Sequence, residues 1–137
     1  MKTQTLRPRI TVGEQEHHQL TVLAAGASTD VADELLAEME RARVVPDASL
    51  PDDVVRMGST ARYRTNAGAE QEVTLVYPAN ADISQGRISV LTPIGTALVG
   101  LKTGQSITWV TREGRKNVLT VLDVRPPQPE AEAEAAE

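Results

Sequence analysis

Ile88-Ser89-Val90-Leu91-Thr92-Pro93-Ile94-Gly95 marks a point at which the sequence changes from the pattern of a strand to that of a helix. Residues 87–91 favour a strand. Thr92 and Pro93 are residue types that begin a helix, threonine as the N-cap and proline at the first helical position. Gly100 is the expected end of that short helix. The corner therefore predicts a helix placed between strands.

Further strands are predicted on both sides of this corner. The residue patterns predict strands at 61–65 and 70–77 before it, and at 105–111 and 117–124 after it. Asn66-Ala67-Gly68 and Glu113-Gly114 are predicted turns. This order of strands, one short helix and a closing hairpin predicts an antiparallel sheet domain of the α+β class over residues 46–125.

Residues 1–45 have a helical pattern instead and predict a short antiparallel hairpin of two helices. Thr11-Val12-Gly13-Glu14 has the spacing of a capping box, Gly26 is a predicted stop, and Ser28 or Thr29 is a predicted cap for the second helix. Each helix is expected to have about 13–15 residues, which is roughly 20 Å. The residues expected to pack between the two helices are Leu20, Leu23, Val31, Leu35 and Met39.

The distribution of charge argues against direct binding of DNA or RNA. The net charge is −5, and Glu130, Glu132, Glu134 and Glu137 supply four of the negative charges, which leaves −1 on residues 1–129. A nearly neutral body does not attract a phosphate backbone. With two Tyr, one Trp and no Phe, the chain also has few side chains on which bases stack. Residues 126–137, rich in Pro and then in Glu and Ala, predict a disordered acidic tail.

The composition predicts a soluble, cytoplasmic protein without a metal or cofactor. There is no cysteine, so disulfides and thiolate metal sites are excluded. Residues 1–10 lack the apolar run of a signal peptide, and no stretch approaches the roughly 18 apolar residues of a membrane span. His17 and His18 are adjacent on a predicted helix and point about 100° apart, so we expect a solvated face rather than a metal site. Asp52-Asp53 is expected to cap a turn rather than to act as an acid–base pair.

Several motifs in the second half resemble the C-terminal domain of the Gre transcript-cleavage factors. Residues 51–59 (PDDVVRMGS) resemble the segment that leads into that domain. Residues 74–78 (TLVYP) and 88–95 (ISVLTPIG) resemble its second strand and the turn with proline, and 97–104 (ALVGLKTG) its short helix and following turn. The chain resembles the Rnk family more than a full Gre factor, and that family is named for regulation of nucleoside diphosphate kinase. The features that indicate this are the chain length, the short helical hairpin and the apolar Leu91.

The resemblance implies an FKBP-like sheet domain and binding at the entrance of the RNA polymerase secondary channel. In Gre factors, acidic residues at the tip of a long coiled coil reach through that channel and help to hold a catalytic magnesium ion. Here the hairpin is much shorter, and Asp30 near its tip stands where a helix N-cap or first-turn acid is expected. The expected function is therefore that of a non-catalytic regulator that competes with Gre-type factors for the polymerase.

The predicted partner-binding site is the turn formed by Ser89, Leu91, Thr92, Pro93 and Ile94. In the functional interpretation, Leu91, Pro93 and Ile94 form an exposed apolar knob, since exposed apolar patches often mark interfaces. In the structural interpretation, Pro93 only starts a helix. The sequence leaves both interpretations open.

Alternative functions include enzymes and a different partner. A transcript-cleavage cofactor is disfavoured by the short hairpin. A prolyl isomerase, which an FKBP-like fold suggests, needs an aromatic pocket that Tyr63, Tyr77 and Trp109 do not suffice to line. Action on nucleoside diphosphate kinase stays open, and we expect it to be indirect rather than by contact. We expect a monomer.

Overall fold

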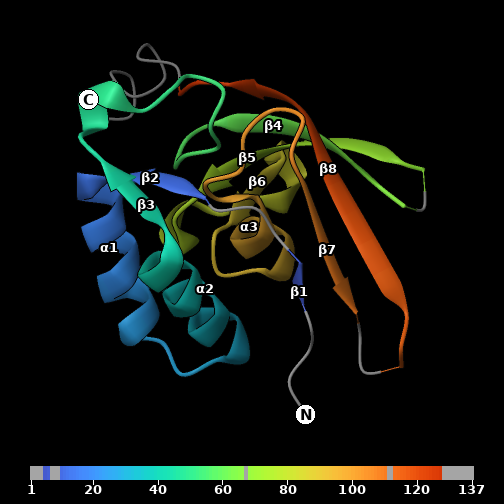
Figure 1. Ribbon diagram of the computed structural model, residues 1–137, viewed down its shortest axis with the longest axis horizontal. Coiled ribbons are helices and arrows are strands. Elements are labelled where there is room, and N and C mark those ends of the chain that lie inside the picture. The colour runs from blue at the N-terminus through green and yellow to red at the C-terminus, as the bar shows by residue number, and fades with distance from the viewer. Residues whose placement is uncertain (1–4, 7–9, 67, 111–112, 128–137) are drawn as a thin grey trace.

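The computed structural model describes residues 5–6, 10–66, 68–110 and 113–127. Two helices, α1 (Glu14–Ala25) and α2 (Asp30–Arg41), precede most of a large sheet that bends around a short third helix, α3 (Pro93–Leu98) (Figure 1). The prediction of an α+β fold is confirmed. Within the described residues the sheet has the order β1-β7-β8-β4-β5-β6. Its strands are β1 (Thr5–Leu6), β4 (Thr60–Thr65), β5 (Glu70–Val76), β6 (Arg87–Ser89), β7 (Ser106–Val110) and β8 (Lys116–Arg125).

The first helix begins differently from the prediction. Thr11 does not cap α1, because Thr11–Gly13 forms strand β2 and the N-cap residue is Gly13, which has no side chain to accept a hydrogen bond. The cap comes from a distant segment instead: a carboxylate oxygen of Asp47 accepts a hydrogen bond of 3.2 Å from the backbone N–H of Gln15. Asp47 belongs to a 3-10 helix, η1 (Asp47–Ser49). The stop at Gly26 is confirmed.

The second helix begins as predicted and packs against the first. The hydroxyl of Thr29 accepts a hydrogen bond of 3.0 Å from the N–H of Ala32. Leu20, Leu35 and Met39 are buried. The remaining residues predicted for this seam, Leu23 and Val31, are only half-buried.

A short pair of parallel strands, which the sequence did not predict, joins the outer ends of the two helices. β2 pairs with β3 (Arg43–Val45), with Thr11 opposite Arg43 and Gly13 opposite Val45. The N–H of Arg43 also donates a hydrogen bond of 2.8 Å to the carbonyl oxygen of Ile10. Strands of three residues are too short to produce a clear alternating pattern.

The prediction of an antiparallel sheet is wrong at one edge. β5 and β6 run parallel, with Thr74 opposite Arg87 and Val76 opposite Ser89. Two 3-10 helices, η2 (Pro78–Asn80) and η3 (Ile83–Gln85), lie between these strands. They carry the chain back toward the middle of β5, so that β6 starts there and runs in the same direction. The other described pairs of this sheet are antiparallel.

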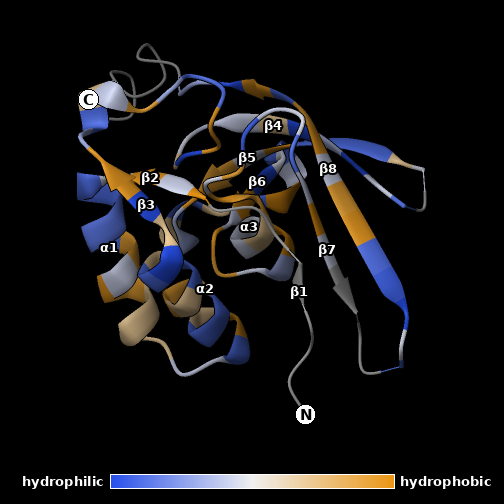
Figure 2. Cartoon of the chain, in the orientation of Figure 1, coloured by the Kyte–Doolittle hydropathy of each residue, from blue (hydrophilic) through white to orange (hydrophobic). Residues whose placement is uncertain are grey.

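One apolar core contains residues of the helices and of the sheet. Leu20 and Leu35 of the helices belong to the same buried cluster as Leu75, Leu98 and Leu119. α3 contacts α2, and Figure 2 shows hydrophobic colour along part of β5 and part of β8, with hydrophilic colour on much of α1. None of the helices in the described part of the chain combines the length and apolar character that crossing a membrane needs.

Some predictions fall on residues that the structure leaves undescribed. These are most of the acidic tail, from residue 128 onward, together with Ala67 of the first predicted turn and Thr111 at the end of a predicted strand. The division into segments 1–45 and 46–125, the hairpin arrangement and the FKBP-like topology stay predictions.

Candidate partner-binding turn

The predicted turn lies where β6, an edge strand of the sheet, leads into α3. Val90 fixes the start of the turn, because its N–H donates a hydrogen bond of 2.9 Å to Val76 O on β5. The Thr92 hydroxyl donates to Ser89 O at 2.7 Å and accepts from the N–H of Gly95 at 3.0 Å. Pro93 is the first residue of α3. The predicted cap and the predicted start of the helix are both confirmed.

Further hydrogen bonds and a close backbone approach fix the conformation of the turn. The hydroxyl of Thr96, which is buried, donates a hydrogen bond of 2.7 Å to the carbonyl oxygen of Val90. The Ser89 hydroxyl accepts from the N–H of Leu91 at 3.0 Å. A Cβ atom at position 95 would collide with Ser89 O, so only glycine allows this close approach. The backbone of the turn is therefore preorganised.

The apolar side chains of the turn are not all equally exposed. Pro93 is exposed, whereas Leu91 and Ile94 are half-buried and pack against the core. Ser89 and Thr92 are also half-buried. The exposed apolar surface is therefore smaller than the sequence suggested, with Pro93 at its outermost point and parts of Leu91 and Ile94 beside it.

A buried carboxylate ties α1 to the segment before β4. Glu16, which is 8% exposed, accepts hydrogen bonds from the N–H of Met57 at 3.1 Å and from Nε of Arg56 at 3.0 Å. Burial raises the pKa of Glu16, and this effect outweighs the hydrogen bond from Met57 and the charge of Arg56, both of which lower it. A sequence gives no sign of such a contact across about forty residues.

The other titratable candidates are the two histidines and the adjacent aspartates Asp52 and Asp53. His17 is half-buried, and its Nε2 lies 3.0 Å from the carbonyl oxygen of Met39 on α2, so the expectation of a solvated face is wrong for His17. His18 is exposed as predicted. Asp52 and Asp53 lie in a turn. Among the described residues, no group of three or more His, Asp or Glu side chains is arranged to hold a metal ion.

The tyrosines are occupied by hydrogen bonds to glutamines. Tyr63 OH donates to Gln71 at 3.4 Å, and Tyr77 OH donates to Gln19 of α1 at 2.7 Å. Burial raises the pKa of both phenols, and for Tyr77 the charge of Glu16 raises it further. Tyr77 thus forms a second link between α1 and the sheet.

Comparison with known proteins identifies the class to which this fold and turn belong. Residues 50–126 match the family described as the C-terminal domain of the transcription elongation factors GreA and GreB. The match contains β4, β5, β6, the turn at 89–94, α3, β7 and β8. The chain belongs to this family.

Within this class, the chain is similar over most of its length to proteins of known name. The Regulator of nucleoside diphosphate kinase of Escherichia coli (strain K12) is 38% identical over 129 residues, which cover 91% of this chain and 94% of that protein. GreA of Azorhizobium caulinodans is 32% identical over 136 residues, which cover 90% of this chain and 86% of that protein. The predicted resemblance to the Rnk family and to the Gre C-terminal domain is confirmed.

A solved structure has a similar fold. The prokaryotic transcription elongation factor GreA/GreB from Nitrosomonas europaea superposes with a TM-score of 0.70 and 36% sequence identity. The superposition covers 87% of this chain and 99% of that one. The relatives are thus named as regulatory and elongation factors.

Proposed function

We propose that this protein is a non-catalytic transcription regulator that binds RNA polymerase at the secondary-channel entrance and competes there with Gre-type factors. The observation that carries the proposal is an asymmetry between the two parts of the chain. The family match covers the sheet domain with its turn, whereas the helices before it have only 12 residues each. The resemblance to Gre factors implies polymerase binding by the sheet domain and transcript cleavage by the helices, and we propose that this chain keeps only the binding role.

The length of the helices argues against a role in transcript cleavage. Twelve residues at 1.5 Å each give about 18 Å of helix. The connection between the helices is formed by Gly26, Ala27, Ser28 and Thr29, and the hydroxyl of Thr29 is used as a cap. Asp30 follows in the first turn of α2, where an acidic residue stabilises the helix dipole. Such a pair does not deliver paired carboxylates to a distant metal ion.

The proposed binding site is the turn with Ser89, Leu91, Thr92, Pro93 and Ile94. A preorganised backbone loses little entropy on binding, which favours a turn held by buried hydrogen bonds as a docking element. Pro93 is the best position at which to test the binding role of the turn, because it is exposed and its replacement leaves the core intact. Pro93→Ala should weaken binding to core RNA polymerase by about 1–2 kcal/mol if the side chain lies at the centre of the interface.

A matched control separates loss of contact from a general effect of removing a proline. Pro46 is also exposed and lies directly before η1, in a different part of the fold. Pro46→Ala should leave polymerase binding unchanged. Leu91→Ala is a second variant of the turn, to be interpreted only with its thermal midpoint, because Leu91 also packs on the core. Equal binding of the Pro93→Ala and Pro46→Ala variants would exclude the turn as the site.

The competition is tested with a backtracked transcription complex. We expect no cleavage product with this protein alone and inhibition of a Gre factor when this protein is in excess. Asp30→Asn should change neither result. Cleavage by this protein alone that disappears in Asp30→Asn would contradict the non-catalytic proposal, and failure to compete would contradict the shared site. A parallel pull-down with nucleoside diphosphate kinase tests direct contact with that enzyme, for which we expect none.

A further inference from the structure

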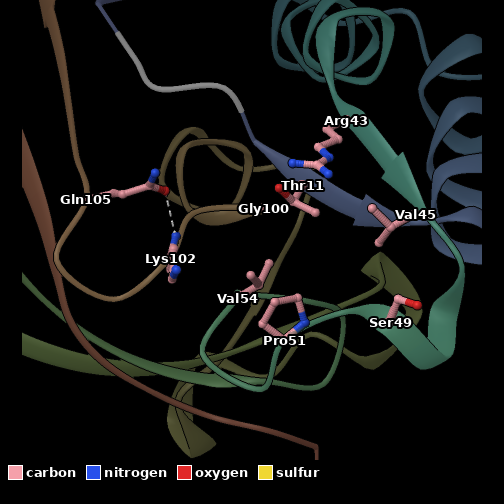
Figure 3. Close-up of a pocket in the computed structure, with 9 residues that line it drawn as sticks. All are labelled: Thr11, Arg43, Val45, Ser49, Pro51, Val54, Gly100, Lys102 and Gln105. Carbon is pink, nitrogen blue, oxygen red and sulfur yellow. Dashed lines mark hydrogen bonds between the residues drawn. The ribbon is translucent and has the colours of Figure 1, made fainter.

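A small cavity lies between the β2–β3 pair, the segment that precedes β4 and the segment that joins α3 to β7 (Figure 3). Its volume is about 260 Å³. Liquid water takes roughly 30 Å³ per molecule, so the cavity has space for a group of several heavy atoms but is smaller than most pockets for drug-sized ligands. The residues that line it are Thr11, Arg43, Val45, Ser49, Pro51, Val54, Gly100, Lys102 and Gln105.

The lining is positively charged. Arg43 and Lys102 contribute two cations, and none of the lining residues is acidic. Some arginines elsewhere in the fold are paired with carboxylates, as in the pairs Arg62–Glu70 and Arg125–Glu72. Within the described part of the chain, the structure gives neither Arg43 nor Lys102 an ion-pair partner. The cavity thus holds a positive charge that nothing in its lining offsets.

The neutral polar groups of the lining also favour an anion. The hydroxyls of Thr11 and Ser49 are hydrogen-bond donors as well as acceptors. The side-chain oxygen of Gln105 accepts a hydrogen bond of 2.9 Å from the N–H of Lys102, as Figure 3 shows. This contact fixes the orientation of the amide and leaves its NH₂ group as a donor.

The walls of the cavity are joined by backbone hydrogen bonds. Thr11 N–H donates to Gly100 O at 3.2 Å, and Gly100 N–H donates to Val55 O at 2.8 Å. Val54 and Lys102 form an isolated β-bridge. Gly100 has a φ of +81°, and a Cβ atom there would collide with Ile10, so this position needs glycine. The lining residues therefore come from a connected framework rather than from independent loops.

We propose that this cavity binds the phosphate group of a small molecule, with Arg43 and Lys102 as its charged ligands. A phosphate matches the chemistry of the lining, because guanidinium and ammonium groups make their strongest hydrogen bonds to charged oxygens. Its tetrahedral oxygens can also accept hydrogen bonds from the hydroxyls and the amide in the lining. The size of the cavity fits a phosphate group with a few attached atoms. Binding here is independent of the turn at 89–94.

The test is a titration of the full-length, ¹⁵N-labelled chain with inorganic phosphate at constant ionic strength, followed by NMR. We expect saturable shifts of the amide signals of Thr11, Gly100 and Lys102. Arg43→Gln and Lys102→Gln should each weaken binding by about tenfold, the loss expected for one charge-assisted hydrogen bond. Arg64→Gln is the matched control, since Arg64 is an exposed arginine on β4 outside the cavity. It should bind phosphate like the natural chain.

Two further measurements test whether the variants stay folded and whether phosphate is the recognised group. Thermal midpoints of the three variants show whether a loss of binding reflects unfolding, and Arg43 and Lys102 are both exposed, so we expect the midpoints to stay unchanged. Ribose 5-phosphate should bind and ribose should not, if the phosphate is the recognised group. Shifts that do not saturate, or that Arg64→Gln weakens as much as Arg43→Gln, would overturn the proposal. Equal binding of ribose and ribose 5-phosphate would overturn it as well.

Discussion

Replacing Glu16 by alanine tests the contact that joins α1 to the sheet domain. The carboxylate is the acceptor for the N–H of Met57, and this hydrogen bond is buried. Without Glu16, that N–H loses its acceptor in a place that water does not reach, which costs about 1–3 kcal/mol. The ion pair with Arg56 adds little, because the Arg56 side chain is 34% exposed and its charge returns to water. Removing the carboxylate also removes the free-energy cost of burying its charge, which offsets part of the loss. We expect a net cost of about 2 kcal/mol.

For a chain of this length, a loss of about 2 kcal/mol lowers the thermal midpoint by roughly 7 °C. Differential scanning calorimetry and urea denaturation measure the two quantities independently. Glu14→Ala is the control, because Glu14 lies in the same first turn of α1 but is exposed, and we expect a change within about 0.5 kcal/mol. If both variants had the same stability, the hydrogen bond to Met57 would not stabilise the fold and the reasoning would be refuted.

Three further predictions concern pH, the helix seam and the cap of α1. Because burial raises the pKa of Glu16 in the folded chain, the stability that this group contributes is fully present below its ordinary value of 4.5 and is lost as the pH rises through the raised value. In urea denaturation at several pH values, the natural chain should therefore lose stability relative to Glu16→Gln as the pH rises, and the opposite slope would mean that the pair with Arg56 dominates. Leu35→Ala, at a fully buried position, should cost about 3–4 kcal/mol and the half-buried Leu36→Ala about 1–2 kcal/mol, and equal losses would contradict the assigned seam. Asp47→Ala should lower the stability by about 1 kcal/mol, and Asp47→Asn, which keeps an acceptor oxygen, should lower it much less. If the two variants had the same thermal midpoint, the cap would not stabilise α1.

The strand-to-helix corner could be predicted from the sequence because its signals are local. Thr92 and Pro93 act on the N–H groups of their own helix, within three residues along the chain. Thr29 acts in the same way on α2. For these two helices the capping partner lies within one turn, and the residue types were sufficient to place the start of the helix.

Features that depend on distant partners could not be predicted in this way. The cap of α1 comes from Asp47, which accepts a hydrogen bond from the N–H of Gln15, 32 residues earlier in the chain. Glu16 looks in the sequence like a solvated acid of a first helical turn, yet the N–H groups that donate hydrogen bonds to its carboxylate lie about forty residues away. The parallel pairing of β5 and β6 depends on the path of η2 and η3, which no residue pattern specified.

The turn that contains the candidate residues was predicted in position, but the exposure of its side chains was not. The residue types of Leu91, Pro93 and Ile94 indicate an apolar turn, and the turn is present. How far each side chain is exposed depends on what packs beneath it, and Leu91 and Ile94 contact the core. The cavity at Arg43 and Lys102 could not be predicted at all, because its lining residues come from separate segments between positions 11 and 105.

The attachment of the helices to the sheet domain bears on the proposed competition with Gre factors. α1 is fixed to the domain at two points, through Glu16 to Met57 and through Gln19 to Tyr77. The helices also supply buried side chains, such as Leu20 and Leu35, to the core on which the turn at 89–94 rests. A helix pair that is part of the core is constrained in its direction as well as in its length. The turn at 89–94 therefore belongs to the same packed body as the helices, which is what the proposed occupation of a docking site without further reach requires.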